Sequence, residues 1–245
     1  MLRKTELIKS LISNDRHLRY KIIEDNEDYL VVDKAAGVNL HRNQHAQSLI
    51  DVLHADFPGE SLHLVHRLDD ATSGLLLIAK NPLAAAEFGR LFATREVEKF
   101  YFALADGKPI KKQGMVVGDI KKSRSGSYLL SRTRSNPSTT QFFSFAIQDG
   151  RRAYLLKPHT GKTHQLRVVM KSLGVPILGD RRYGPSTQDS DRMYLHAMAL
   201  RFHFRGSERR YLCIPHDGEA FADGALQPVL LNCQSPWDIK WPSLK

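Results

Sequence analysis

The sequence has 245 residues, of which 42% are hydrophobic and 25% are charged, proportions that are typical of a folded globular protein and exclude a disordered chain. Its 36 Lys and Arg residues outnumber 26 Asp and Glu residues, which gives a formal net charge of +10. Such a charge favours phosphate-rich partners, because neutralising phosphates releases their counterions. With only two cysteines and no CxxC pair, neither a disulfide framework nor a zinc ribbon is predicted.

Residues 1–20 are polar and basic without a strand pattern, and they are predicted to form a short lead-in. The chain then reads as one mixed, β-dominated domain over residues 21–245. The start has no apolar run long enough for a signal peptide, and nothing approaches the ~18 apolar residues of a membrane span. We therefore expect a cytoplasmic protein without a membrane partner. A monomer is the default expectation.

Strand-like patterns recur along the chain. A hairpin is predicted where two β-rich runs, 22–23 and 29–32, flank the polar turn 25–28. Two apolar runs of strand length, 61–65 and 74–79, enclose a polar loop. Later strands are predicted over residues 98–105, 151–157, 193–204 and 211–214.

Two helices have clear start or stop signals. Asn81 is a good cap and Pro82 suits the first helical position, ahead of apolar residues at helical spacing. A second helix is predicted from the spacing of Leu166, Val169, Met170 and Leu173, with Thr163 as its cap and Gly174 at its end.

The segment 111–138, named here the basic insertion, is rich in Lys, Arg, Ser and Gly. We predict that it is exposed, and that it is either a solvated loop or a surface that contacts RNA. Its candidate RNA contacts are Lys121, Lys122, Arg124, Arg132 and Arg134.

Residues 66–74, with the sequence HRLDDATSG, form a compact polar loop between two apolar strands, which is a favourable position for an active site. A carboxylate in this loop can be a nucleophile, a general base or a structural cap. Asp69 and Asp70 are adjacent, and neighbouring side chains on an extended loop point in different directions. A pair of carboxylates for glycoside hydrolysis is therefore not indicated.

Other familiar sites are incomplete. The segment Gly161-Lys162-Thr163 lacks the earlier glycine of a phosphate-binding loop, where Leu156 stands. His159 and His164 have no Cys pair to complete a zinc site, and we predict no metal. A serine hydrolase triad around the loop 66–74 would lack the G-x-S-x-G elbow.

Five segments, in order, resemble the motifs of the RluA-type pseudouridine synthases. The loop 66–74 resembles the HRLDxxTSG signature of that family. Residues 22–37 resemble the opening strand pair and its Lys-Pro-x-Gly turn, with Ala35 in place of Pro. Residues 160–167 resemble the G-R-x-H-Q-[IL]-R motif, with Lys in place of the first Arg. Residues 177–183 and 195–197 match the two motifs that follow.

The resemblance implies an α+β fold with a mixed, mainly antiparallel sheet flanked by helices and loops. It also implies that Asp69 attacks the target uridine while its N-glycosidic bond breaks, after which the uracil rejoins through carbon 5. By the same resemblance Tyr101 lies beside the uracil, Leu195 is a pocket wall, and Arg167 pairs with Asp69. A guanidinium beside a carboxylate favours its ionised form.

A uridine inside folded RNA must be extruded before an enzyme can act on it. The resemblance makes Arg67 the residue that occupies the vacated space, and no cofactor is implied. The predicted partner is RNA, either tRNA or rRNA, and Lys162 is a further candidate contact. The alternative is a non-catalytic RNA-binding module that retains the fold.

Overall fold

The computed structural model describes residues 19–40, 47–185 and 189–243, which group into two compact units, residues 1–93 and 94–245. Most of the predicted lead-in, residues 1–18, lies outside the described residues. The single domain predicted over residues 21–245 stays a prediction. The α+β class, with a mixed and mainly antiparallel sheet flanked by helices, is confirmed.

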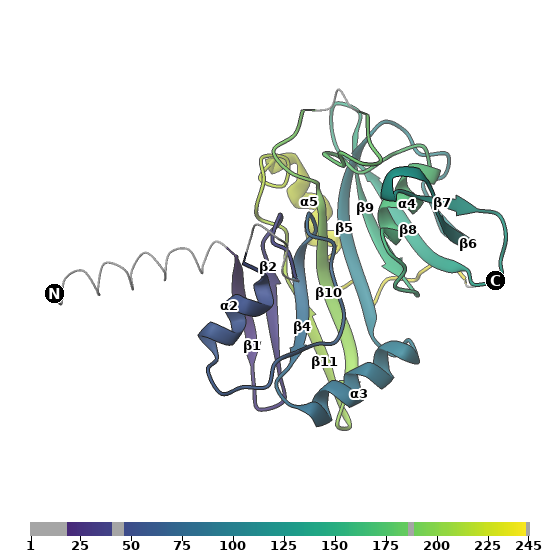
Figure 1. The fold of residues 1–245 in the computed structure, drawn as a ribbon. Coiled ribbons are helices and arrows are strands. Elements are labelled where there is room, and N and C mark those ends of the chain that lie inside the picture. The colour runs from purple at the N-terminus through teal and green to yellow at the C-terminus, as the bar shows by residue number, and fades with distance from the viewer. Residues whose placement is uncertain (1–18, 41–46, 186–188, 244–245) are drawn as a thin grey trace. The chain divides into compact units, whose positions relative to one another are not determined.

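Over residues 19–40 and 47–93, the N-terminal unit is built from strands and two helices, and their arrangement is visible in Figure 1. Its elements are β1 (Tyr20–Asp25), β2 (Tyr29–Lys34), α2 (Leu49–Asp56), β3 (His63–Leu64), β4 (Ser73–Ala79) and α3 (Pro82–Ala93). β2 pairs with both β1 and β4, and β3 pairs with β4, all antiparallel. The predicted hairpin is therefore confirmed, whereas the strand predicted over 61–65 is limited to two residues.

Side chains cap the start of α3 and connect both helices to the strands. The backbone N–H of Ala84 donates to Asn81 Oδ1 at 2.8 Å, which confirms the predicted cap of α3. Phe88 of α3 makes an edge-to-face contact with Tyr29 of β2, with ring centroids 5.4 Å apart. The hydroxyl of Tyr20 in β1 donates to Asp56 at the end of α2, a helix that the sequence analysis missed.

The C-terminal unit contains most of the strands. Its elements are β5 (Glu98–Asp106), β6 (Gln113–Lys122), β7 (Tyr128–Ser131), β8 (Ser138–Ala146), β9 (Arg151–Pro158), α4 (Gln165–Ser172), β10 (Leu195–Phe204), β11 (Ser207–Leu212) and α5 (Gln227–Asn232), with short 3₁₀ helices at Arg124–Gly126 and Gly224–Leu226. The strand order is β11-β10-β5-β9-β8-β6-β7, and every neighbouring pair in it is antiparallel.

The basic insertion forms part of this sheet, so the solvated-loop interpretation is wrong. β6 pairs with both β7 and β8, and the resulting β6–β7 hairpin is visible at one edge of the unit in Figure 1. Its five predicted RNA-contact residues are all exposed, as expected.

One face of the sheet in the C-terminal unit is closed by a core. Phe102 and Leu104 of β5 and Leu155 of β9 are fully buried in it, together with Phe221 and residues of α5. Phe100 contacts both Trp237 and Trp241, with ring centroids 6.5 and 5.9 Å apart. This face therefore supplies much of the hydrophobic stabilisation of the unit.

Candidate functional site

The Asp69 loop, residues 65–72, connects β3 to β4 in the N-terminal unit. Leu68 is buried, with 3% of its surface exposed, and anchors the loop. Its two neighbours differ in exposure, because Arg67 is exposed and Asp69 is half-buried. The loop therefore presents a carboxylate and a guanidinium on either side of a hydrophobic anchor.

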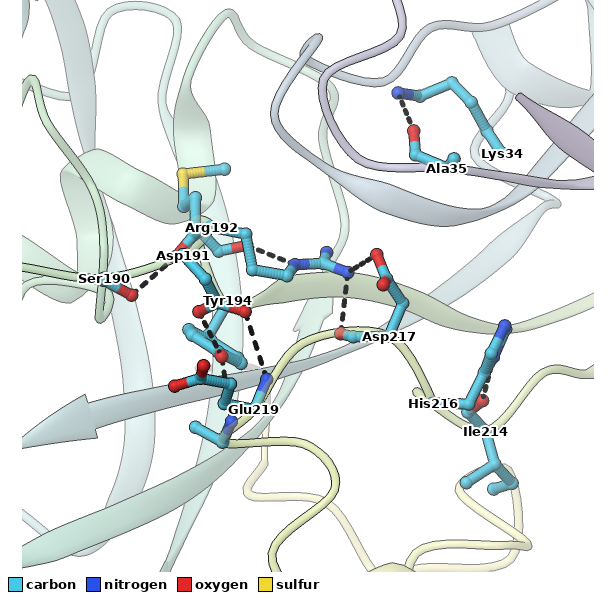
Figure 2. A network of polar contacts seen from close by, with 12 residues as sticks. Lys34, Ala35, Ser190, Asp191, Arg192, Tyr194, Ile214, His216, Asp217 and Glu219 are labelled. Carbon is cyan, nitrogen blue, oxygen red and sulfur yellow. Dashed lines mark hydrogen bonds and ion pairs between the residues drawn. The ribbon is translucent and has the colours of Figure 1, made fainter. Parts of the chain in front are cut away.

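Buried groups fix the backbone at Asp69 and immediately after it. Lys34, which is fully buried, donates from Nζ to the carbonyl oxygens of Ala35, Val38 and Asp70 at 2.9, 2.9 and 3.0 Å. The bond to Ala35 is drawn in Figure 2. The N–H of Thr72 donates to the carbonyl of Asp69 at 2.9 Å. Because an ammonium has three donors, these bonds satisfy the buried charge and hold the loop against the turn that follows β2.

His66 at the start of the loop has a structural contact that opposes the hydrolase interpretation. Its Nε2 accepts the N–H of Leu77 at 2.9 Å, and its ring stacks on Phe92 with centroids 4.9 Å apart. A hydrolytic base needs that nitrogen to accept a proton from a nucleophile. His66 instead fastens the loop to β4 and α3.

Tyr101 lies on the opposite face of β5 from the closed core. Phe100 and Phe102 are fully buried, whereas Tyr101 is half-buried. Alternate side chains of a strand point to opposite faces, so the prediction that these phenylalanines turn away from Tyr101 is confirmed. Lys99 shares the face of Tyr101, and burial lowers its pKa to about 8.

The strand β10 brings Leu195 to this same face. Leu195 is opposite Ala103 and Ala197 is opposite Tyr101 in the antiparallel register, and residues directly opposite share a face. Leu195 is 3% exposed. Tyr101 and Leu195, both predicted from the sequence, therefore lie on one face of two neighbouring strands.

A polar network holds the segment that leads into β10 (Figure 2). Arg192 donates to the carboxylate and to the carbonyl of Asp217, both at 2.9 Å. Tyr194 donates to Asp191 and accepts the N–H of Ala220 at 2.8 Å. These bonds fix the chain immediately before Leu195.

Helix α4 begins at Gln165 and covers the Tyr101 face at the β8 end of the sheet. Gln165 donates to Thr140 Oγ1 at 2.9 Å and to the carbonyl of Thr139 at 3.2 Å. Phe142, Leu156 and Tyr101 are directly opposite one another across β8, β9 and β5, so their side chains share a face. Thr140, two residues before Phe142 on β8, lies on the same face. Gln165 also accepts from Lys162 N–H at 3.0 Å.

The predicted cap of this helix is wrong. The residue at the cap is His164, in the left-handed region with φ 56°, rather than Thr163. The Gln165 side chain satisfies backbone N–H of the preceding turn, and this tertiary arrangement overrides the usual preference for a Thr cap. The predicted end is confirmed, because Gly174 follows the helix with φ 79°.

Arg167 in the first turn of α4 forms a bidentate pair with Asp180. Its Nε and Nη2 donate to the two carboxylate oxygens, both at 2.8 Å, and the Asp180 side chain is fully buried. Burial alone would raise the pKa of Asp180, but the hydrogen bonds and charge of Arg167 lower it below its ordinary value. The predicted pair of Arg167 with Asp69 joins residues of different units and stays a prediction.

The basic insertion is shaped by its one acidic residue. Asp119 accepts from Thr133 Oγ1 at 2.6 Å, from Ser135 N–H at 3.1 Å and from Asn136 N–H at 2.9 Å. These bonds lower the pKa of Asp119. Lys162 Nζ donates to Asn136 Oδ1 at 2.8 Å, so this predicted RNA contact lies at the junction between the insertion and α4.

One departure from the family motifs has a local explanation. The N–H of Ala35 donates to the carbonyl of Arg19 at 2.8 Å, extending the β1–β2 pairing. Proline has no N–H and could not make this bond.

Several supporting residues were not assigned a role from the sequence. Lys34, Lys99 and Gln165 are examples, and so is Asp180, the partner of Arg167. The motifs around Lys34 and Gln165 were noticed, but a side chain's partners depend on tertiary contacts. In the described part of the chain, no helix has the length and apolar character needed to span a bilayer.

Known proteins resemble this chain in sequence and in fold. A family model described as RNA pseudouridylate synthase matches residues 28–172. An uncharacterized RNA pseudouridine synthase of Haemophilus influenzae is 43% identical over 202 residues, covering 82% of this chain and 90% of that protein. Ribosomal large subunit pseudouridine synthase C of Rickettsia conorii is 35% identical over 184 residues, covering 72% of this chain and 61% of that protein.

A solved structure agrees with these matches. The structure of human RNA Pseudouridylate Synthase Domain Containing 1 superposes with a TM-score of 0.74 at 28% identity, covering 93% of this chain and 98% of that one. The class is therefore that of the RNA-modifying isomerases. The chain belongs to the RNA pseudouridylate synthase family, as its motifs predicted.

Proposed function

We propose that this protein converts a specific uridine of tRNA or rRNA to pseudouridine, with Asp69 as the nucleophile. The observation that carries the proposal is the Asp69 loop itself. The carboxylate of Asp69 is half-buried, and its backbone is fixed because the carbonyls of Asp69 and Asp70 accept hydrogen bonds from Thr72 N–H and Lys34 Nζ. A nucleophile benefits from such a fixed position, because little freedom remains to be lost in the transition state.

The proposed reaction is an isomerisation. Asp69 attacks the target nucleotide as the bond between C1′ and N1 breaks, and the uracil turns in the site. A bond then forms between C1′ and C5 as the bond made by Asp69 breaks and frees its carboxylate, C5 loses its proton, and N1 gains one. The atoms of substrate and product balance, so no oxidant or cofactor is required.

The face that carries Tyr101 and Leu195 supplies the proposed uracil site. Tyr101 offers an aromatic ring with a hydroxyl at its tip, and Leu195 offers an apolar wall beside it. We assign Arg67, which is exposed two residues before Asp69, to the space left by the extruded base. Its planar guanidinium can stack on bases and bind phosphate.

The basic insertion supplies the proposed RNA-docking surface. Residues 111–138 hold seven Lys and Arg residues and one acidic residue, Asp119, whose carboxylate is used within the insertion. The RNA backbone is then attracted to a surface with almost no opposing charge. We propose that the protein acts as a monomer in the cytoplasm.

The relatives suggest where to look first. The Rickettsia conorii relative is named for the ribosomal large subunit, although this chain spans only 61% of its length. Large-subunit rRNA is therefore the first RNA to examine, and tRNA the second.

Mapping pseudouridine in total RNA from a deletion strain tests the proposal. The strain is complemented with wild type, Asp69→Asn or the matched control Asp70→Asn, whose carboxylate has no proposed role. We expect one site to lose pseudouridine and to regain it with wild type and Asp70→Asn only. If every site persists in the deletion strain, and the purified protein modifies no isolated RNA, the protein is better described as a non-catalytic RNA-binding module.

A further inference from the structure

The side chain of Tyr183 lies between the basic insertion and α4. It is 4% exposed, and its hydroxyl has one partner on each side. The hydroxyl oxygen accepts the N–H of Tyr128, the first residue of β7, at 3.0 Å. It also bonds Nδ1 of His164, the residue that caps α4, at 2.9 Å.

The Tyr183 hydroxyl can serve both bonds at once. Since the oxygen of Tyr183 accepts from Tyr128, its own proton is available for Nδ1 of His164. Burial raises the pKa of Tyr183, so the hydroxyl keeps this proton at neutral pH. One hydroxyl therefore joins the backbone of β7 to the side chain at the start of α4.

Ring contacts reinforce this link. His164 makes edge-to-face contacts with Tyr128 and with Tyr183, with centroids 5.5 and 5.7 Å apart. The guanidinium of Arg167 lies 5.1 Å from the centroid of the Tyr183 ring. The residue that holds the insertion therefore also touches the arginine proposed for the active site.

Two further contacts attach the insertion to the same region. Arg182 donates to the carbonyl of Ser125 at 2.8 Å, and Lys162 donates to Asn136 at 2.8 Å. The loop that carries Tyr183 is held in turn, because Asp180 accepts the N–H groups of Arg182 and Tyr183 at 3.0 and 3.1 Å. Asp180 is also the partner of Arg167.

His164 has a strained backbone at this junction. Its φ of 56° is in the left-handed region, where a residue other than glycine is uncommon and costs energy. The contacts of its ring with Tyr183 and Tyr128 help to hold it there. A movement of the β6–β7 hairpin would therefore be transmitted to the first turn of α4.

We propose that Tyr183 is a positioning residue through which RNA bound to the basic insertion sets the position of Arg167. This inference rests on the proposed function, and it adds a coupling between RNA docking and the catalytic step. Docking restrains the hairpin, the hairpin restrains Tyr183, and Tyr183 with Asp180 restrains the guanidinium.

Hydrogen exchange tests the link without using activity. Tyr183→Phe removes the hydroxyl and keeps the ring, and Tyr154→Phe is the matched control, because among the described residues the Tyr154 hydroxyl has no hydrogen-bond partner in the basic insertion or in α4. We expect backbone amides of residues 124–131 and 164–168 to exchange about tenfold faster in Tyr183→Phe. Exchange in these segments that equals wild type would overturn the proposal.

Single-turnover kinetics test the coupling itself. The probe is a transcript of the RNA identified in the deletion strain, labelled with tritium at C5 of uridine, because forming the new bond releases that hydrogen. Arg132→Gln/Arg134→Gln is made in the wild-type and Tyr183→Phe backgrounds. In the wild-type background we expect it to lower the rate at saturating RNA about threefold, besides weakening binding. In the Tyr183→Phe background, where the rate is already about tenfold lower, we expect it to weaken binding only.

The two proposals fail in different ways. Equal effects of the arginine substitutions on the saturating rate in both backgrounds would refute the coupling while leaving the synthase activity intact. A wild-type protein that releases no tritium from any RNA would refute the proposed function, and with it the coupling to catalysis.

Discussion

The two faces of β5 in the C-terminal unit differ in what covers them. On one face, Phe100 and Phe102 are fully buried and are covered by Trp241, Phe221 and the end of the described chain. On the other face, Tyr101 and Lys99 are only half-buried, and α4 covers the sheet farther along at β8.

This difference separates stability from recognition within one strand. The closed face gains free energy from apolar burial, whereas the other keeps polar tips available for a substrate. Substitutions on the first face should therefore change the free energy of unfolding, and substitutions on the second should change the reaction rate. Four predictions test this separation, from the largest expected effect to the smallest.

Phe102→Ala should have the largest effect. Removing a fully buried phenylalanine leaves a cavity, and we expect the free energy of unfolding to fall by about 3–5 kcal/mol. Urea denaturation of the whole chain measures this. The rate per folded molecule at saturating RNA should change less than about twofold, since a cavity on this face does not touch the substrate. A large loss of rate with an unchanged free energy of unfolding would contradict the assignment of this face to stability.

Asp180→Asn tests whether the buried ion pair with Arg167 of α4 also contributes to the free energy of unfolding. Removing the carboxylate leaves the guanidinium of Arg167 without its buried partner, and we expect a loss of about 3 kcal/mol at pH 7. The pKa of Asp180 is lowered in the folded protein, so its contribution is present above the unfolded value and is lost as pH falls through the folded value. Denaturation curves of the two proteins should therefore approach each other below about pH 4. A difference that is constant from pH 7 to pH 3 would contradict this.

Tyr101→Phe should separate rate from stability. The ring stays while the hydroxyl is lost, and we expect the single-turnover rate to fall about 100-fold. The free energy of unfolding should change by less than about 1 kcal/mol, because the Tyr101 side chain is only half-buried. Tyr154→Phe, opposite Ala103 on the same face, is the control that should keep the rate. Equal losses of rate in both variants would show that Tyr101 has no special role.

Arg132→Gln/Arg134→Gln should have the smallest effect, mainly on RNA affinity, with the rate at saturating RNA lowered only by the threefold that the coupling through Tyr183 predicts. Both side chains are exposed, and losing two phosphate contacts should weaken binding about tenfold at 0.1 M salt. The slope of log affinity against log salt should also fall by about 1.5. Filter binding over a salt series measures both, with Arg151→Gln, outside the insertion, as the control. If the slope of log affinity against log salt is unchanged, RNA phosphates do not contact Arg132 and Arg134.

Local patterns were sufficient for much of the fold. Runs of β-favouring and apolar residues predicted β2, β5 and β9, and a capping Asn before a Pro predicted the start of α3. These features depend on neighbours in sequence, where side-chain direction and backbone hydrogen bonding are set locally. The resemblance also placed Tyr101 and Leu195 correctly on one face, because their strands pair in regular register.

The remaining features depend on distant partners. A buried lysine is rare, and Lys34 is buried only because three carbonyl oxygens converge on it, one of them from Asp70. The hairpin within the basic insertion was missed because its charged residues suggested a solvated segment, whereas pairing with β8 stabilises it. His164 stands at the cap of α4 because Tyr183 holds its ring and the Gln165 side chain satisfies Lys162 N–H, and these contacts outweigh the local preference for Thr163.

The closed face of β5 has a consequence for synthesis of the protein. β5 is hydrogen-bonded to β10, almost a hundred residues later in the chain, and Phe100 is covered by Trp241. Contacts between such distant residues make folding slow, because a long loop must close before they stabilise anything. The nascent C-terminal unit therefore cannot complete its core until Trp241 has left the ribosome. Until then the aromatic side chains of β5 are exposed to solvent, where they favour aggregation and offer a binding surface for a chaperone.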